Sequence, residues 1–100
     1  PISVAAALRT TAETPAQKRY AVLGVMAEVL HSDVAHQEIA TLCQQLGIEL
    51  LALETDLYGT SALSLSDIAK TLDGHDSNTV VLVKGSRVAA AERVVQVLVV

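Results

Sequence analysis

The sequence is poor in the residues on which several classes of protein depend. Only one of its 100 residues is a cysteine, Cys43, which excludes an internal disulfide and any metal site built from several cysteines. A chain without disulfides is typical of a reducing compartment, so the cytoplasm is the predicted location. The apolar runs are far shorter than the ~20 residues that cross a bilayer, which argues against a membrane-spanning helix.

Large aromatic and basic side chains are also scarce. Tyr20 and Tyr58 are the only two aromatics, with no Phe or Trp, so the sequence cannot build the stacking surface that binds single-stranded nucleic acid. Its 7 Lys and Arg residues are scattered and outnumbered by 11 Asp and Glu, for a net charge of −4. Binding to nucleic-acid phosphates needs clustered cations, so nucleic acid is excluded as a partner.

Aliphatic residues dominate what remains, since 51% of the chain is hydrophobic. A core of Val, Leu, Ile and Ala is expected where helices pack on a buried parallel sheet. The length suits one domain, which we expect to span residues 1–100. The chain starts at Pro1 without an initiator Met, and we interpret it as part of a larger protein.

Apolar spacing and turn residues predict alternating helices and strands. Strands are expected at residues 20–24, 48–53, 62–65 and 79–83. Helical faces are expected at residues 4–12, 35–46 and 68–72, and in a last helix with Ala91, Val94, Val95 and Leu98 facing inward. The order α-β-α-β-β-α-β-α, with right-handed crossovers, predicts a three-layer α/β sandwich with a mainly parallel sheet.

Turn chemistry sets the expected helix ends. Thr14 precedes Pro15 and therefore avoids the helical region, which ends the first helix. Gly47 is expected at positive φ just beyond the second helix. Ser64 and Asp67 have the spacing of a capping box for the third helix, although Ser66 competes as its cap.

Ligands of open parallel sheets bind outside the carboxyl ends of the strands, which nominates residues 25–28, 54–58 and 84–87. The last segment places two cations, a flexible glycine and a hydroxyl where a strand passes into the expected helix: Lys84, Gly85, Ser86 and Arg87. Cations beside a helix N-terminus indicate a site for a carboxylate or phosphate. The alternative is a solvated turn.

The loop after the first strand holds further candidates. Met26 and Glu28 follow its glycine, and a carboxylate there either holds a metal, a ribose hydroxyl or an amine or is a surface residue. His36 either lies near this loop or is a surface or boundary histidine. His31 and His36 lack the i, i+4 spacing of a zinc pair, so no metal site is expected.

No catalytic residue is predicted in this chain. Cys43 lies on the apolar face of its helix, which predicts a buried structural thiol rather than a nucleophile. Neither a G-x-G-x-x-G motif nor a P-loop follows the first strand, so the chain is not expected to bind a nucleotide by itself.

Three segments together resemble one enzyme family. Residues 80–87 read V-V-L-V-K-G-S-R and residues 92–95 read E-R-V-V. This is similar to the V-L-V-K-G-S-R and M-E-x-V-V near the end of the UDP-N-acetylmuramoyl-tripeptide–D-alanyl-D-alanine ligases, in the Mur ligase family. Residues 20–28, Y-A-V-L-G-V-M-A-E, resemble the family's L-G-D-M-x-E-L, and His36 matches a histidine in its next helix. Residues 1–8 resemble the end of its N-A-N-P-x-S-M-x-A-A-L junction. Val25 stands where the family has Asp.

The resemblance implies a Rossmann-like Mur ligase C-terminal domain from a cytoplasmic enzyme of peptidoglycan synthesis. With ATP and Mg²⁺, bound mainly by its central domain, such an enzyme phosphorylates the carboxylate of a UDP-linked muramoyl tripeptide. The amine of D-alanyl-D-alanine then attacks the acyl phosphate. The C-terminal domain closes against the central domain and helps to hold the dipeptide.

Site residues follow from the same resemblance. Dipeptide binding is assigned to residues 84–87, and candidate contacts with nucleotide or substrate are Met26, Glu28, His36 and Tyr58. We expect the chain to be monomeric and, alone, inactive. Two alternatives remain: the C-terminal domain of another Mur-type amino acid ligase, or a stand-alone flavodoxin-like interaction module.

Overall fold

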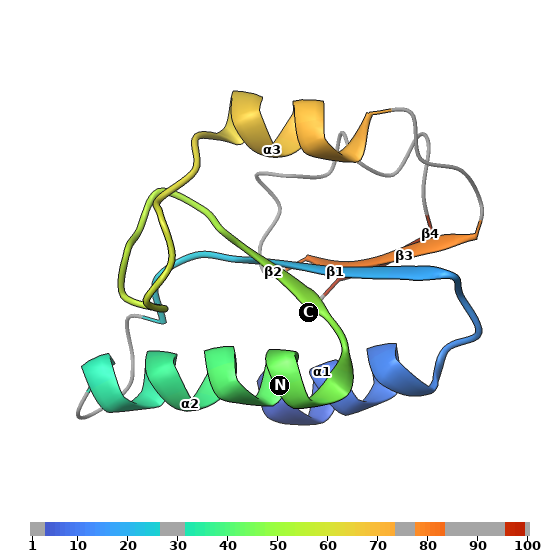
Figure 1. The fold of residues 1–100 in the computed structure, drawn as a ribbon, viewed down its shortest axis with the longest axis horizontal. Helices are drawn as coiled ribbons and strands as arrows, with labels where there is room; N and C mark the ends of the chain where they lie inside the picture. The colour runs from blue at the N-terminus through green and yellow to red at the C-terminus, as the bar shows by residue number, and fades with distance from the viewer. Residues whose placement is uncertain (1–3, 27–31, 74–77, 84–95, 100) are drawn as a thin grey trace.

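The computed structural model describes residues 4–26, 32–73, 78–83 and 96–99. Its helices are α1 (Val4–Glu13), α2 (Ser32–Leu46) and α3 (Leu65–Leu72). Its strands are β1 (Lys18–Leu23), β2 (Glu49–Ala52), β3 (Thr79–Val83) and β4 (Gln96–Val99). Figure 1 shows these elements in three layers, with α3 on one face of the sheet and both α1 and α2 on the other.

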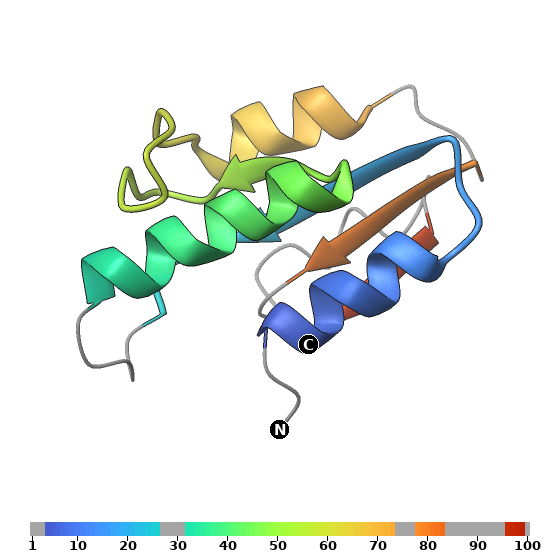
Figure 2. The ribbon, with the colours of Figure 1, turned by 60° about the horizontal axis from the view of Figure 1, so that its bottom comes forward.

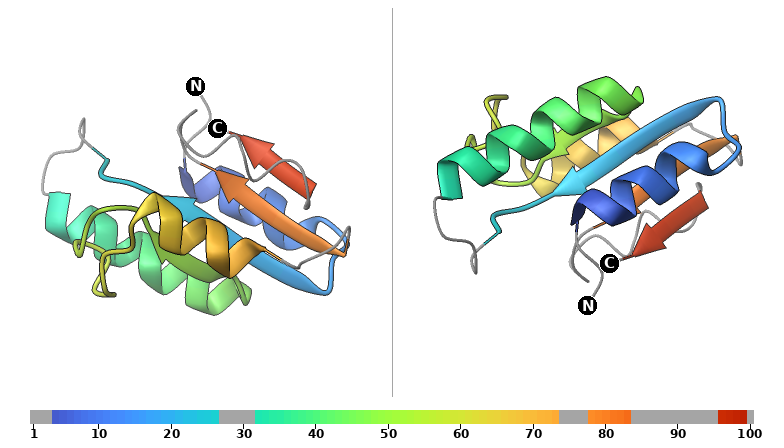
Figure 3. Two further views of the ribbon diagram at one scale, coloured as in Figure 1. Left: turned by 90° about the horizontal axis from the view of Figure 1, so that it is seen from above. Right: turned by 90° about the horizontal axis from the view of Figure 1, so that it is seen from below.

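The sheet has four parallel strands in the order β2-β1-β3-β4. β1 is central, and its Val22 lies opposite Leu51 of β2 and Val83 of β3. Every residue of β3 is buried, which explains why this strand reads as a continuous apolar run. In the left view of Figure 3 the strands run side by side, with α3 in front of β1 and β2. The predicted α/β architecture with a parallel sheet between helices is confirmed.

Successive residues of the strands point to opposite faces of the sheet and build two separate core clusters. On the α3 side, Tyr20 and Val22 pack with Ile68 and other buried residues. On the other side, Ala21 and Leu23 pack with buried residues that include Leu8, Cys43 and Leu82. Figure 2 shows α1 and α2 next to one another on this face of the sheet. None of the described helices is both long and apolar enough to cross a membrane.

The expected helix ends are confirmed where they can be compared. α1 ends at Glu13, just before Thr14, and Gly47 follows α2 with a φ of 71°. Ser64 is the cap of α3 rather than Ser66: the Asp67 N–H donates to Ser64 Oγ at 3.0 Å, and the Ser64 N–H donates to Asp67 Oδ2 at 3.4 Å.

One expected element, and the end of another, are wrong. Residues 62–65 form no strand; Leu63 makes one isolated parallel bridge to Leu53, because the capping box turns the chain into α3 at residue 65. Leu98, expected in a last helix, lies in strand β4. Its neighbours Val97 and Val99 are β-branched and favour an extended chain beside β3. The rest of that expected helix, with Ala91, Val94 and Val95, lies outside the described residues.

Candidate functional site

The strand order places a topological switch point between β1 and β3. From β1 the chain passes through α2 to β2 on one side, and from β2 it passes through α3 to β3 on the other. In doubly wound sheets, ligands bind at this point, outside the carboxyl ends of the two strands. Residues 24–26 follow β1 here, whereas residues 84–87, which follow β3, lie outside the described residues.

Two side chains from other elements hold the backbone of residues 24–26. The Met26 N–H donates to Nε2 of His36, on α2, at 2.9 Å. The Tyr58 hydroxyl, from the loop after β2, donates to the Gly24 carbonyl at 2.6 Å. The two rings meet edge to face, with centroids 4.8 Å apart and planes at 66°. We call this arrangement of His36 and Tyr58 on the loop the ring latch.

Both rings of the latch are buried: His36 is 0% exposed and Tyr58 is 3% exposed. The reading of His36 as a surface or boundary histidine is therefore wrong, and its proximity to the loop is confirmed. Nε2 accepts the hydrogen bond of the Met26 N–H through its ring lone pair. Burial, with a smaller contribution from nearby Cys43, raises the pKa of Tyr58 to about 12, so its hydroxyl remains a donor at neutral pH.

The loop that carries Tyr58 is shaped by its own backbone. Glu54 and Gly59 both have positive φ, 57° and 85°, which turns the chain back toward β1. The Leu53 N–H donates to the Leu23 carbonyl at 2.8 Å and joins this loop to the end of β1. The Leu57 N–H donates to Oγ1 of Thr55 at 3.2 Å, a local turn that precedes the tyrosine.

The structure thus unites three of the predicted contact residues, Met26, His36 and Tyr58. The hydrogen bond from the tyrosine hydroxyl to Gly24 could not be predicted from local sequence patterns, because these residues are 34 positions apart. Val25, between Gly24 and Met26, is 54% exposed. Glu28 and the predicted dipeptide site, Lys84, Gly85, Ser86 and Arg87, lie outside the described residues.

Cys43 is a buried thiol, as predicted from its place on the helical face. Burial raises its pKa to about 11, so the thiolate needed for nucleophilic chemistry is rare at neutral pH. Among the described residues, no group of three or more His, Cys, Asp or Glu is placed to hold a metal ion.

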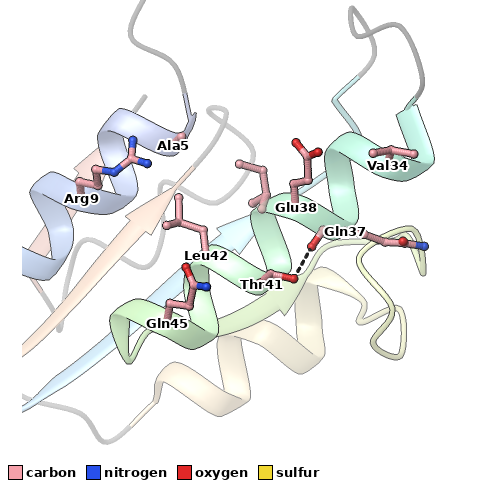
Figure 4. A pocket seen from close by; sticks show the side chains of 9 residues that line it. Ala5, Arg9, Val34, Gln37, Glu38, Thr41, Leu42 and Gln45 are labelled. Atoms are coloured by element: carbon pink, nitrogen blue, oxygen red, sulfur yellow. Dashed lines mark hydrogen bonds between the residues drawn. The ribbon is translucent and has the colours of Figure 1, made fainter.

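An open groove lies away from the loop, between α1 and α2 (Figure 4). It encloses about 520 Å³, and of its nine lining residues Arg9 and Glu38 carry a charge. A second hollow of about 540 Å³ beside β2 reaches Cys43 and Tyr58 from the outer edge of the sheet. Residues 24–26 line neither of these hollows, so the loop at the switch point between β1 and β3 is the stronger candidate site.

No protein-family model, curated protein or solved structure matches this chain. The site therefore rests on its own geometry, a backbone loop at the switch point held by two buried rings.

Proposed function

We propose that this chain is the Rossmann-like C-terminal domain of a cytoplasmic, ATP-dependent Mur-type ligase that joins D-alanyl-D-alanine to a UDP-linked muramoyl tripeptide. One observation carries the proposal: the two segments that most resemble this family, residues 20–28 and 80–87, include most of the two strands at the switch point, residues 20–23 of β1 and 80–83 of β3. Residues far apart in the sequence thus converge where a parallel sheet binds its ligand.

In this role the domain binds and orients the incoming dipeptide. The planar guanidinium of Arg87 donates two parallel hydrogen bonds to the terminal carboxylate, a geometry that Lys cannot reproduce. Lys84 adds a second charge or contacts the nucleotide when the domains close. Gly85 lets the backbone approach the ligand, and Ser86 donates to it or caps the following segment. ATP, bound with Mg²⁺ mainly by the central domain, supplies the phosphoryl group that activates the tripeptide carboxylate.

The deciding experiment measures amide formation by the full-length polypeptide that contains this chain. We expect phosphate release that requires ATP, Mg²⁺, the UDP-linked tripeptide and D-alanyl-D-alanine together, and no turnover by the 100-residue chain alone. Release with a single amino acid in place of the dipeptide would assign the chain to another Mur-type ligase. No release with any acceptor would contradict a ligase and favour a stand-alone interaction module.

Substitution of Arg87→Lys tests the carboxylate contact. A lost charged hydrogen bond costs ~1.5–3 kcal/mol, so KM for D-alanyl-D-alanine should rise by about 10- to 100-fold while KM for ATP changes little. The melting temperature should barely move. Arg9→Lys, on α1 in the groove of Figure 4, is the matched control and should leave both KM values unchanged. Unchanged dipeptide kinetics with a lower melting temperature would show that residues 84–87 have a structural role.

A further inference from the structure

Neither the backbone conformation nor the packing of the described residues requires a glycine at position 24. Its φ lies outside the left-handed region that favours glycine, unlike those of Gly47 and Gly59. Among the described residues, the nearest atom to a Cβ built on Gly24 is the Leu53 carbonyl oxygen at 3.9 Å, an ordinary contact. Glycine generally destabilises a strand end relative to alanine, because the unfolded chain has more freedom to lose. The absence of a side chain at position 24 therefore indicates that a ligand approaches the main chain closely there.

The backbone around Gly24 is also fixed in place on both sides of Val25. Tyr58 holds the Gly24 carbonyl and His36 holds the Met26 N–H, each from a buried ring. Between them, the N–H and carbonyl of Val25 have no hydrogen-bond partner within the described part of the chain, and the residue is 54% exposed. A backbone held by hydrogen bonds on both sides can bind a ligand with less loss of conformational entropy than a free loop.

We infer that the main chain of residues 24–26 is a binding surface for a peptide-like ligand, with Gly24 against the ligand and the Val25 N–H and carbonyl paired to its amide. His36 and Tyr58 are positioning residues, since they are buried and act only through the loop they hold. This inference rests on the proposed function in taking the ligand to be D-alanyl-D-alanine.

Gly24→Ala tests the contact. In the 100-residue chain, the urea midpoint should be unchanged or higher, because the added methyl meets no close neighbour. In the full-length ligase, KM for D-alanyl-D-alanine should rise at least 10-fold with KM for ATP unchanged. Gly47→Ala is the matched control: its φ of 71° strains an alanine, so the midpoint should fall while dipeptide KM stays constant.

The positioning role is tested by His36→Leu, His36→Gln and Tyr58→Phe. Leucine removes the acceptor for Met26, so the Met26 amide should exchange with solvent faster and dipeptide KM should rise. The Oε1 of glutamine can take the place of Nε2, so His36→Gln should restore both. Tyr58→Phe removes one hydroxyl and should raise dipeptide KM, whereas Thr11→Val, which loses a buried hydrogen bond to the Ala7 carbonyl on α1, should not.

These measurements distinguish failure of the ligase activity from failure of the binding surface at residues 24–26. A wild-type ligase that ignores D-alanyl-D-alanine would refute the proposed function. An active wild type with an unchanged KM in Gly24→Ala would overturn only the binding surface. A lower urea midpoint in Gly24→Ala would also overturn the binding surface, because the added methyl group would then clash with the chain itself. Unaltered Met26 exchange in His36→Leu would overturn the positioning role.

Discussion

Two titratable side chains, Cys43 and Tyr58, belong to the same core cluster between the sheet and α2. Burial is the main cause of both raised pKa values, about 11 for the thiol and about 12 for the phenol. Burial also raises the pKa of Tyr20 on the other face, with a smaller contribution from Glu49. All three groups are uncharged near neutral pH, so the core contains them without the penalty of a buried charge.

These shifts predict a loss of stability in alkali. Above the ordinary pKa values of 9.0 for Cys and 10.0 for Tyr, the unfolded chain loses protons that the folded chain still holds. The folded state then binds more protons, so the free energy of unfolding falls as pH rises through the window from 9 to about 12. One pKa unit corresponds to ~1.4 kcal/mol, so the two groups together contribute about 5 kcal/mol at most.

Urea unfolding followed by circular dichroism at pH 8, 10 and 11 checks this expectation. Cys43→Ala should flatten the lower part of the alkaline decline and Tyr58→Phe the upper part. Both variants should be less stable than the wild type at pH 8, Cys43→Ala by roughly 1–2 kcal/mol because of a small cavity. Declines parallel to that of the wild type in both variants would show that these groups do not cause it.

Residue roles were only partly predictable from sequence. The burial of Cys43 follows from its place on one helical face, a local property that spacing reveals. The role of His36 does not, because its partner is a backbone N–H in a loop whose position over α2 depends on the assembled sheet. Resemblance to a family drew attention to His36 and Met26, but only the fold shows that they touch.

At the scale of elements, α3 depends on its first turn more than the longer helices do. It has 8 residues, and isolated helices shorter than ~12–15 residues are marginal in water. Two of its residues, Ile68 and Leu72, are buried against the sheet, while the capping box satisfies backbone donors at its start. The cap therefore determines where the helix begins.

Ser64→Ala should destabilise the chain by ~1 kcal/mol, because the Asp67 N–H loses its acceptor. Ser66→Ala, two residues further on and also exposed, is the matched control and should change the free energy of unfolding by less than ~0.5 kcal/mol. Chemical denaturation of both variants measures the difference. Equal effects would mean that the side chain of Ser64 contributes nothing specific as a cap.

Element prediction succeeded where two signals agreed and failed where they competed. β3 was predicted with its observed bounds because it is short, β-branched and buried on both faces. Residues 62, 63 and 65 are apolar, but Ser64 forms a capping box with Asp67, and the capping box determines the structure. The apolar run around Leu98 fits a helix or a strand, and periodicity alone cannot separate these for so short a run.

The two core clusters share the strands of one sheet, so neither can be lost without disrupting the other. β1 gives Tyr20 and Val22 to one cluster and Ala21 and Leu23 to the other. β3 contributes in the same way to both faces, and it pairs with β1 along five residues. Loss of either cluster would expose strands that the other cluster also needs, so we expect both faces to unfold together.

The two tyrosines provide a direct test, since each lies in a different cluster and the chain has no Trp. In Tyr58→Phe, the fluorescence of Tyr20 reports the α3 face; in Tyr20→Phe, that of Tyr58 reports the face beneath α1 and α2. Within each variant, the fluorescence and far-ultraviolet circular dichroism transitions in urea should coincide, the sign of all-or-none unfolding. The midpoints of the two variants will differ, because Tyr58→Phe also loses the hydrogen bond to Gly24, so the comparison is made inside each variant. A tyrosine signal that changes at lower urea than the dichroism, in either variant, would show that one layer of helices detaches from the sheet before the rest unfolds.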